Sequence, residues 1–116
     1  MYTVFGIPNC DSVKKATNWL KEHNIPFTFH DYKTSGIDTD TLHAWCEQQN
    51  WEIIFNKRST TYKELPASIQ QSVTSAAQAI PIMQQHTSII KRPIIVKKRK
   101  VVAVGFDAKK YETIFM

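Results

Sequence analysis

The sequence predicts a single α/β domain, with strands near both ends of the chain and helices between them. An apolar run, a helical pattern and a second apolar run follow one another at the N-terminus, and two runs rich in β-branched residues stand close together after Pro93. A chain of 116 residues is long enough to bury a core without disulfides or a structural metal. We therefore expect one domain over residues 1–116.

The first three elements form a β-α-β unit. Residues 3–5 read as a buried strand, and residues 12–23 as a helix whose apolar side chains share one face. Those side chains are Val13, Ala16, Trp19 and Leu20. Asn24 and Pro26 end the helix, and residues 27–32 alternate as a second strand. Because a strand, helix, strand order implies a right-handed crossover, we expect the two strands to run parallel.

The middle of the chain carries no comparable pair of strands. Residues 39–86 read mainly as helices, with Asp38 or Thr39 as the cap of the first and Pro66 heading a later one. We therefore expect a helical insertion over this range.

The C-terminal part of the chain reads as a hairpin followed by a helix. Residues 94–96 and 101–104 are strand-like runs joined by a short basic cluster, and residues 105–107 open a last helix over 108–115. With the β-α-β unit in front and the helical insertion between, this is the element order of a thioredoxin-like fold.

The basic composition does not require a nucleic-acid partner. The net charge is +5 and the pI is near 9.3, but much of the excess lies in the cluster Lys97-Lys98-Arg99-Lys100 between two strands, where a basic β-turn is the simpler interpretation. No aromatic residues are interleaved with it, so we expect no nucleic-acid partner. No apolar stretch approaches the ~20 residues of a membrane span, and the N-terminus lacks the pattern of a cleavable signal. We therefore expect a cytoplasmic protein with no membrane partner.

Cys10 is the most informative residue of the chain. It lies between the first strand and the first helix, so its thiol is expected at a helix N-terminus. Unpaired backbone N–H groups and the positive end of the helix dipole favour a thiolate there. This position predicts thiol chemistry.

The second cysteine, Cys46, shares a helical face with Leu42 and Trp45 and reads as a small buried residue. A resolving thiol is the alternative, which a crosslink between Cys10 and Cys46 in oxidised protein would test. The four histidines are scattered, with no close Cys/His pair, so we expect no metal site.

Three sequence motifs carry a resemblance to a known family. They are Asn9-Cys10 before the first helix, Thr60-Thr61-Tyr62-Lys63-Glu64-Leu65 in the insertion, and Ile90-Lys91-Arg92-Pro93-Ile94-Ile95-Val96 before the hairpin. Through them the whole chain resembles the arsenate reductase (ArsC) family. Residues 6–16, 56–61 and 104–107 are most similar to its YffB-type branch, and Spx-type regulators are the next relatives.

The resemblance implies a site made from distant parts of the chain. Cys10 would be the nucleophile, and Arg92, before a cis Pro93, would face it and help to hold an anion or a glutathione adduct. An arginine favours a nearby thiolate and offers planar donors to an oxyanion or carboxylate. Arg58 matches the arginine of the YffB and Spx branches and is expected to assist.

Two departures from the family pattern argue against arsenate as the substrate. Gly6 stands where many arsenate reductases have a histidine, and the arginine expected after the last strand is replaced around Gly105-Phe106-Asp107. An oxyanion pocket that lacks one guanidinium group should bind arsenate poorly, because each charge-assisted contact is worth roughly 1.5 to 3 kcal/mol. Arsenate reduction with a modified oxyanion site is kept as an alternative function.

The cysteine pattern predicts a monothiol enzyme. Val13 stands three residues after Cys10, so no Cys-x-x-Cys pair exists and an external thiol must resolve the mixed disulfide. Glutathione is the expected co-substrate, with no tightly bound cofactor. We expect the thiolate to be stabilised by Ser12 and by the amides of Ser12 and Val13, and glutathione to bind against Asn9, Ser12, Val13, Arg92 and Pro93.

The sequence thus predicts a glutathione-dependent thiol reductase, a monomer acting on a small oxidised or disulfide substrate. A second class of function is a redox regulator of the Spx kind that binds RNA polymerase, although the second cysteine of the Spx switch is missing at Val13. His30, Asp31 and Tyr32 invite a catalytic interpretation, but strand alternation separates Asp31 from the other two, and we assign them no chemistry.

Overall fold

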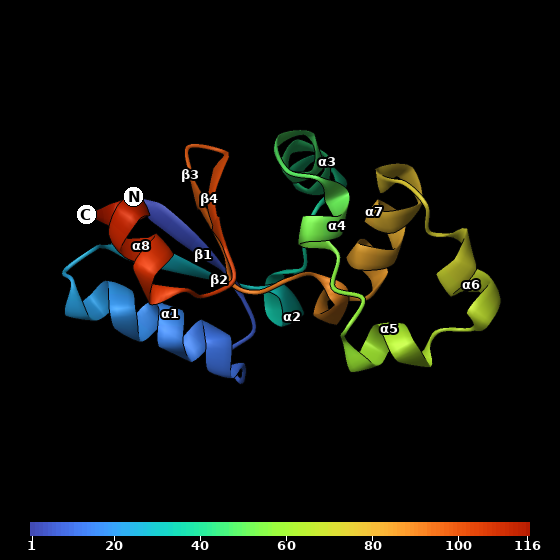
Figure 1. The fold of residues 1–116 in the computed structure, drawn as a ribbon, viewed down its shortest axis with the longest axis horizontal. Helices are drawn as coiled ribbons and strands as arrows, with labels where there is room; N and C mark the ends of the chain where they lie inside the picture. The colour runs from blue at the N-terminus through green and yellow to red at the C-terminus, as the bar shows by residue number, and fades with distance from the viewer. The chain divides into compact units, whose positions relative to one another are not determined.

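The computed structural model describes all residues, Met1–Met116, as two compact units (Figure 1). The first unit combines Met1–Ser35 with Arg92–Met116, and the second is Gly36–Lys91. None of the helices is both long enough and apolar enough to cross a membrane.

The first unit is a four-stranded sheet covered on one face by two helices. Its strands are β1 (Tyr2–Gly6), β2 (Phe27–Asp31), β3 (Ile94–Lys97) and β4 (Lys100–Val104). Its helices are α1 (Asp11–Glu22), the short α2 (Tyr32–Ser35) and α8 (Ala108–Phe115). The strand order is β2-β1-β3-β4; β1 and β2 run parallel, and the other neighbouring pairs run antiparallel. The β-α-β unit, the hairpin and the last helix are therefore confirmed.

The core of this unit is a row of side chains across the sheet with the two long helices above it. Val4 of β1 pairs with Ile95 of β3, which pairs with Ala103 of β4. Trp19 of α1 and Tyr111 of α8 pack on the same cluster, and their rings meet edge to face at 5.4 Å between centroids. Both helices therefore cover the same face of the sheet.

The second strand ends one residue earlier than predicted. Residues 27–32 alternate as a strand in sequence, but β2 stops at Asp31 and Tyr32 begins α2. The Asp31 carboxylate accepts the backbone N–H of Lys33 at 2.8 Å, a local turn that competes with strand extension.

The second unit is helical, and it contains the residues expected as a helical insertion. Its elements are α3 (Thr39–Gln48), α4 (Trp51–Ile54), α5 (Thr60–Glu64), α6 (Ala67–Ser72), α7 (Ala76–Gln85) and η1 (Thr87–Ile89). Asp38 caps α3 by accepting the N–H of Thr41 at 2.7 Å, as predicted, and Pro66 precedes α6. The hydroxyl of Thr39 on α3 donates to Gln84 on α7 at 2.8 Å, which joins the two longest helices of this unit.

Candidate active site

Cys10 lies where the chain passes from β1 to α1. A short turn follows the end of β1 at Gly6, and Cys10 is the N-cap residue of α1, with an extended backbone (φ −109°, ψ 126°). Its carbonyl accepts the N–H of Lys14 at 3.0 Å, the first hydrogen bond of the helix. No hydroxyl or carboxylate caps this helix end, so the amides of the first turn are left to face the half-buried thiol.

The surroundings of Cys10 favour its thiolate. Burial raises the pKa of the thiol, but hydrogen bonds from the Val13 amide, the Arg92 side chain and the Ser12 amide oppose this, as does the positive charge of Arg92. The balance places the pKa of Cys10 below its ordinary value. A larger fraction of this thiol is therefore ionised at neutral pH than in an ordinary cysteine, which is the state that attacks a disulfide.

The sheet topology brings Arg92 to Cys10. Arg92 lies two residues before β3, whose first residue, Ile94, pairs with Phe5 near the end of β1. The Arg92–Pro93 peptide bond is cis, as the resemblance implies. Pro93 is buried, and its carbonyl accepts the N–H of Gly105 at 2.8 Å. Two segments at opposite ends of the sequence are thus held together by the pairing of β1 with β3.

The other predicted site residues differ in their surroundings. Ser12 and Val13 contribute backbone N–H groups to the Cys10 thiol, while the side chain of Ser12 is exposed. Asn9 is exposed in the turn before Cys10. Arg58 lies in the second unit, exposed in the turn between α4 and α5, where its backbone N–H donates to Asn56 at 3.1 Å. The catalytic role of Arg58 stays a prediction.

Tyr32 also lies in this region, although its sequence context predicted no chemical role. It is 1% exposed, and its ring lies 6.2 Å from that of Phe5 near the end of β1. Its hydroxyl has no hydrogen-bond partner in the protein. Burial raises the pKa of Tyr32 well above its ordinary value, with the charge of Arg92 acting in the opposite direction. The signal available in the sequence was its place at the end of the second strand, beside the site.

Cys46 has different surroundings from Cys10. It lies on α3 in the second unit and is half-buried, whereas Leu42 and Trp45 on the same helix are fully buried. Burial raises the pKa of the Cys46 thiol. Both cysteines are free thiols. Cys46 therefore lacks the donors that lower the pKa of Cys10, and it is less buried than the sequence predicted.

Comparisons with known proteins agree with this architecture. The sequence profile of the ArsC family matches residues 5–114. A solved structure named YFFB (PA3664) protein is 35% identical and superposes with a TM-score of 0.93, and the match covers 100% of both chains. A solution structure of an arsenate reductase (ArsC) related protein from Brucella melitensis is 40% identical with a TM-score of 0.77, covering 98% of this chain and 93% of that one.

Relatives found by sequence also match nearly the whole chain. An uncharacterized protein of Haemophilus influenzae is 40% identical over 115 residues, which are 99% of each chain. The global transcriptional regulator Spx of Streptococcus pneumoniae is 29% identical over 109 residues, which are 92% of this chain and 80% of the regulator. Together with the structural matches, these likenesses confirm the thioredoxin-like α/β fold.

Proposed function

The chain belongs to the ArsC family, and on that premise we propose that the protein is a glutathione-dependent thiol reductase with Cys10 as its single nucleophile. The family and its arsenate reductase-related members support thiol-based reductase chemistry. The observation that carries the proposal is the set of donors on the Cys10 thiol, two backbone amides and the Arg92 side chain, which lowers its pKa. Glutathione is abundant in the cytoplasm, where we propose that the protein acts as a monomer.

The proposed reaction consists of thiol–disulfide exchanges. The Cys10 thiolate attacks one sulfur of a substrate disulfide R–S–S–R′; the S–S bond breaks, Cys10 becomes joined to R–S, and R′–S⁻ leaves and takes up a proton. A glutathione thiolate then attacks the R sulfur, which frees the Cys10 thiolate and forms a mixed disulfide of R–S with glutathione. A second glutathione reduces this mixed disulfide. In total, two glutathione molecules are oxidised to their disulfide and the substrate is reduced to two thiols.

The residues around Cys10 have distinct tasks in this scheme. The Ser12 and Val13 amides and Arg92 stabilise the thiolate, both before attack and when it leaves the mixed disulfide. We propose that Arg92 also pairs with a carboxylate of glutathione, with Pro93 and Asn9 beside the same ligand. Arg58 is proposed to assist, as in the branch that the sequence resembles.

Two other functions, arsenate reduction and transcriptional regulation, can be distinguished from the proposed one by experiment. Arsenate reduction would have to work with glycine at position 6 and with Gly105-Phe106-Asp107 in place of the expected arginine, so charge for binding the oxyanion is missing. A regulator of the Spx kind, acting on RNA polymerase, would lack the second cysteine of the switch, because Val13 occupies that position.

The test is glutathione-coupled turnover of a small disulfide, beside arsenate as substrate, in the wild type, Cys10→Ser and Cys46→Ser. We expect disulfide turnover that is lost in Cys10→Ser and retained in Cys46→Ser, with no arsenate turnover. Cys46→Ser is a matched control because it removes the other free thiol of the chain. Arsenate turnover, or no turnover of any disulfide with folded protein, would contradict the proposal; the second result would favour a regulatory role.

A further inference from the structure

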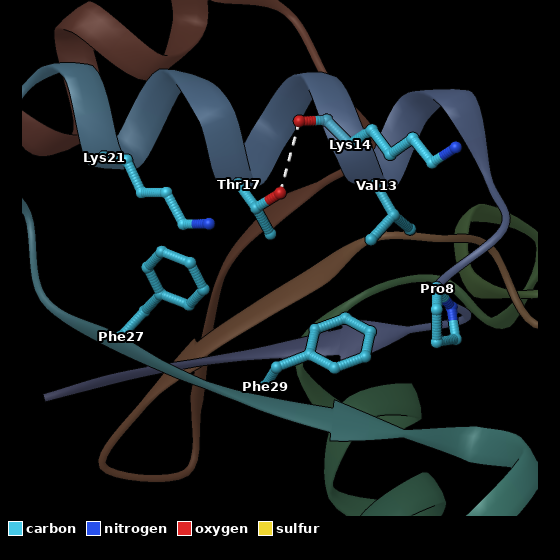
Figure 2. Close-up of a pocket in the computed structure, with 7 residues that line it drawn as sticks. All are labelled: Pro8, Val13, Lys14, Thr17, Lys21, Phe27 and Phe29. Carbon is cyan, nitrogen blue, oxygen red and sulfur yellow. Dashed lines mark hydrogen bonds between the residues drawn. The ribbon is translucent and has the colours of Figure 1, made fainter.

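A groove lies alongside α1, between this helix and the outer strand of the sheet (Figure 2). Its volume is about 260 Å³. Pro8, Val13, Lys14, Lys21, Phe27 and Phe29 line it, together with Thr17. We call it the Phe29 groove. Because ligand pockets for whole small molecules usually measure ~300–1,000 Å³, a groove of this size suits one arm of a ligand.

One end of the Phe29 groove adjoins the nucleophile. Val13 lines the groove with its side chain, while its backbone N–H donates to the Cys10 thiol. Pro8, two residues before Cys10, closes the same end (Figure 2). Lys21 lies at the other end, eight residues along α1 from Val13, which is about 12 Å at the rise of an α-helix. A group attached to a sulfur at Cys10 could therefore lie along the groove.

The floor of the groove is aromatic and accessible. Phe27 and Phe29 are two residues apart on β2, so both project from the same face of the strand, toward α1 (Figure 2). Phe29 is 39% exposed, a large apolar side chain at the edge of the sheet. The hydroxyl of Thr17 donates to the Lys14 carbonyl at 3.2 Å, so this polar atom of the lining already has a partner. The floor thus favours an apolar group over a polar one.

The rim of the groove is positively charged. Lys14 and Lys21 are seven residues apart on α1, close to two helical turns, and so lie on the same side of the helix. No acidic residue lines the groove. An apolar floor below two ammonium groups is complementary to a ligand that is apolar along its length and carries an anion.

We propose that the Phe29 groove binds one arm of the disulfide substrate, and that this arm is an aromatic or similarly apolar group bearing a carboxylate. The inference rests on the proposed function, because it needs exchange at Cys10. Glutathione itself fits the groove poorly, since it has no large apolar side chain to cover Phe27 and Phe29. The groove would therefore select the substrate, and glutathione would approach Cys10 from elsewhere.

The test compares two aromatic disulfides that differ in charge, in a Cys46→Ser background so that only Cys10 reacts. Each reagent forms a mixed disulfide with Cys10 and releases one coloured thiol. The carboxylated probe is 5,5′-dithiobis(2-nitrobenzoate) and the neutral one is 4,4′-dithiodipyridine. The measured quantity is the ratio of the two second-order rate constants at pH 7. A third reagent, bis(2-hydroxyethyl) disulfide, has no aromatic arm. The rates of the aromatic probes relative to the rate of this aliphatic one measure the contribution of the apolar floor.

We expect Lys14→Gln and Lys21→Gln each to lower the carboxylated-to-neutral ratio by about two- to fivefold. Lys15→Gln is the matched control: it removes the same charge from the same helix, but Lys15 does not line the groove. Phe29→Ala should lower the rates of both aromatic probes relative to the aliphatic one by about three- to tenfold. Ile114→Ala, 38% exposed on α8, is its control.

The outcomes separate the two proposals. Equal ratios in the groove variants and their controls, with Cys10 still reactive, would overturn the Phe29 groove and leave the reductase function standing. No reaction of Cys10 with any probe would overturn the reductase function and the groove with it. A dimer in solution that Phe29→Ala dissociates would put a second copy on the groove and overturn the substrate assignment.

Discussion

Gly6→Ala should destabilise the protein and disturb the Cys10 thiolate at the same time. A β-carbon at Gly6 would lie 2.7 Å from Cγ2 of Val13. This is about 0.8 Å shorter than the lower end, ~3.5 Å, of the optimal van der Waals separation between two carbons. Val13 is 3% exposed and branched at its own β-carbon, so it has no flexible end that can move aside. Overpacking of this kind costs about 1–3 kcal/mol in the free energy of unfolding.

The same substitution should raise the pKa of Cys10. The Val13 amide is the main hydrogen-bond donor that lowers this pKa, so displacing Val13 weakens the bond. The measurement is the pH dependence of the rate at which Cys10 reacts with a neutral disulfide. In Gly6→Ala its midpoint should lie at higher pH than in the wild type.

A double-mutant cycle with Val13→Ala isolates the steric cause. The β-carbon of Val13 lies 3.7 Å from the place that a β-carbon at Gly6 would take, an ordinary contact, so Gly6→Ala should cost less than about 0.5 kcal/mol once the Val13 methyl groups are gone. Urea unfolding of the four proteins gives the coupling. A cost of Gly6→Ala that is the same in both backgrounds would refute the reasoning.

Further predictions concern the Cys10 thiolate, the buried hydroxyl of Tyr32 and the Asp107 cap of α8. Arg92→Met should raise the pKa of Cys10, seen as an upward shift of the pH–rate midpoint with a neutral disulfide; an unchanged profile would contradict the contact. Because folding lowers the Cys10 pKa, the unfolding free energy of the wild type relative to Cys10→Ser should rise with pH up to about 8.5 and be lost as pH falls through the folded pKa, as urea unfolding across pH would measure. Tyr32→Phe removes a buried hydroxyl that has no partner, so thermal unfolding should show stability unchanged or raised by up to about 1–3 kcal/mol; a clear loss would mean that the hydroxyl has a partner in solution. Asp107→Ala removes the acceptor of two N–H groups at the start of α8 and should cost about 0.5–2 kcal/mol in the same measurement, whereas Asp11→Ala, where no such bond is made, should not.

Most of the fold could be predicted because the periodic apolar residues of the sequence are the residues that the helices and strands bury. The helical spacing of Val13, Ala16 and Leu20 is the buried face of α1, and the β-branched runs are β3 and β4. The basic β-turn predicted between those strands is confirmed, but the sequence did not predict its backbone conformation. Its residues Lys98 (φ 50°) and Arg99 (φ 69°) have left-handed backbones that usually call for asparagine or glycine, so strand pairing overrides local preference there.

The site could be predicted only in part. Cys10 and its amide donors are neighbours in sequence, so the helix N-terminus was visible in the chain itself. Arg92 reaches Cys10 through the pairing of β1 with β3, and it was the family resemblance that pointed to it. The place of Tyr32 at the end of the second strand was visible in the sequence, but its burial and the Phe29 groove depend on how α1 and α2 pack on the sheet, which the local pattern does not show.

Val13 occupies the position that bears most directly on the proposed single-thiol chemistry. Its position, three residues after Cys10, is the one at which a Cys-x-x-Cys pair would place a second cysteine. Here its methyl groups fill the space that Gly6 leaves, its side chain lines the Phe29 groove, and its amide donates to Cys10. A cysteine at position 13 would keep the amide but lose a methyl group from a buried contact, which leaves a small cavity beside Gly6. The packing of Gly6 against Val13 therefore fits the proposed site, in which a thiol from outside the chain resolves the mixed disulfide, and a histidine at position 6 would meet the same methyl group that disfavours alanine.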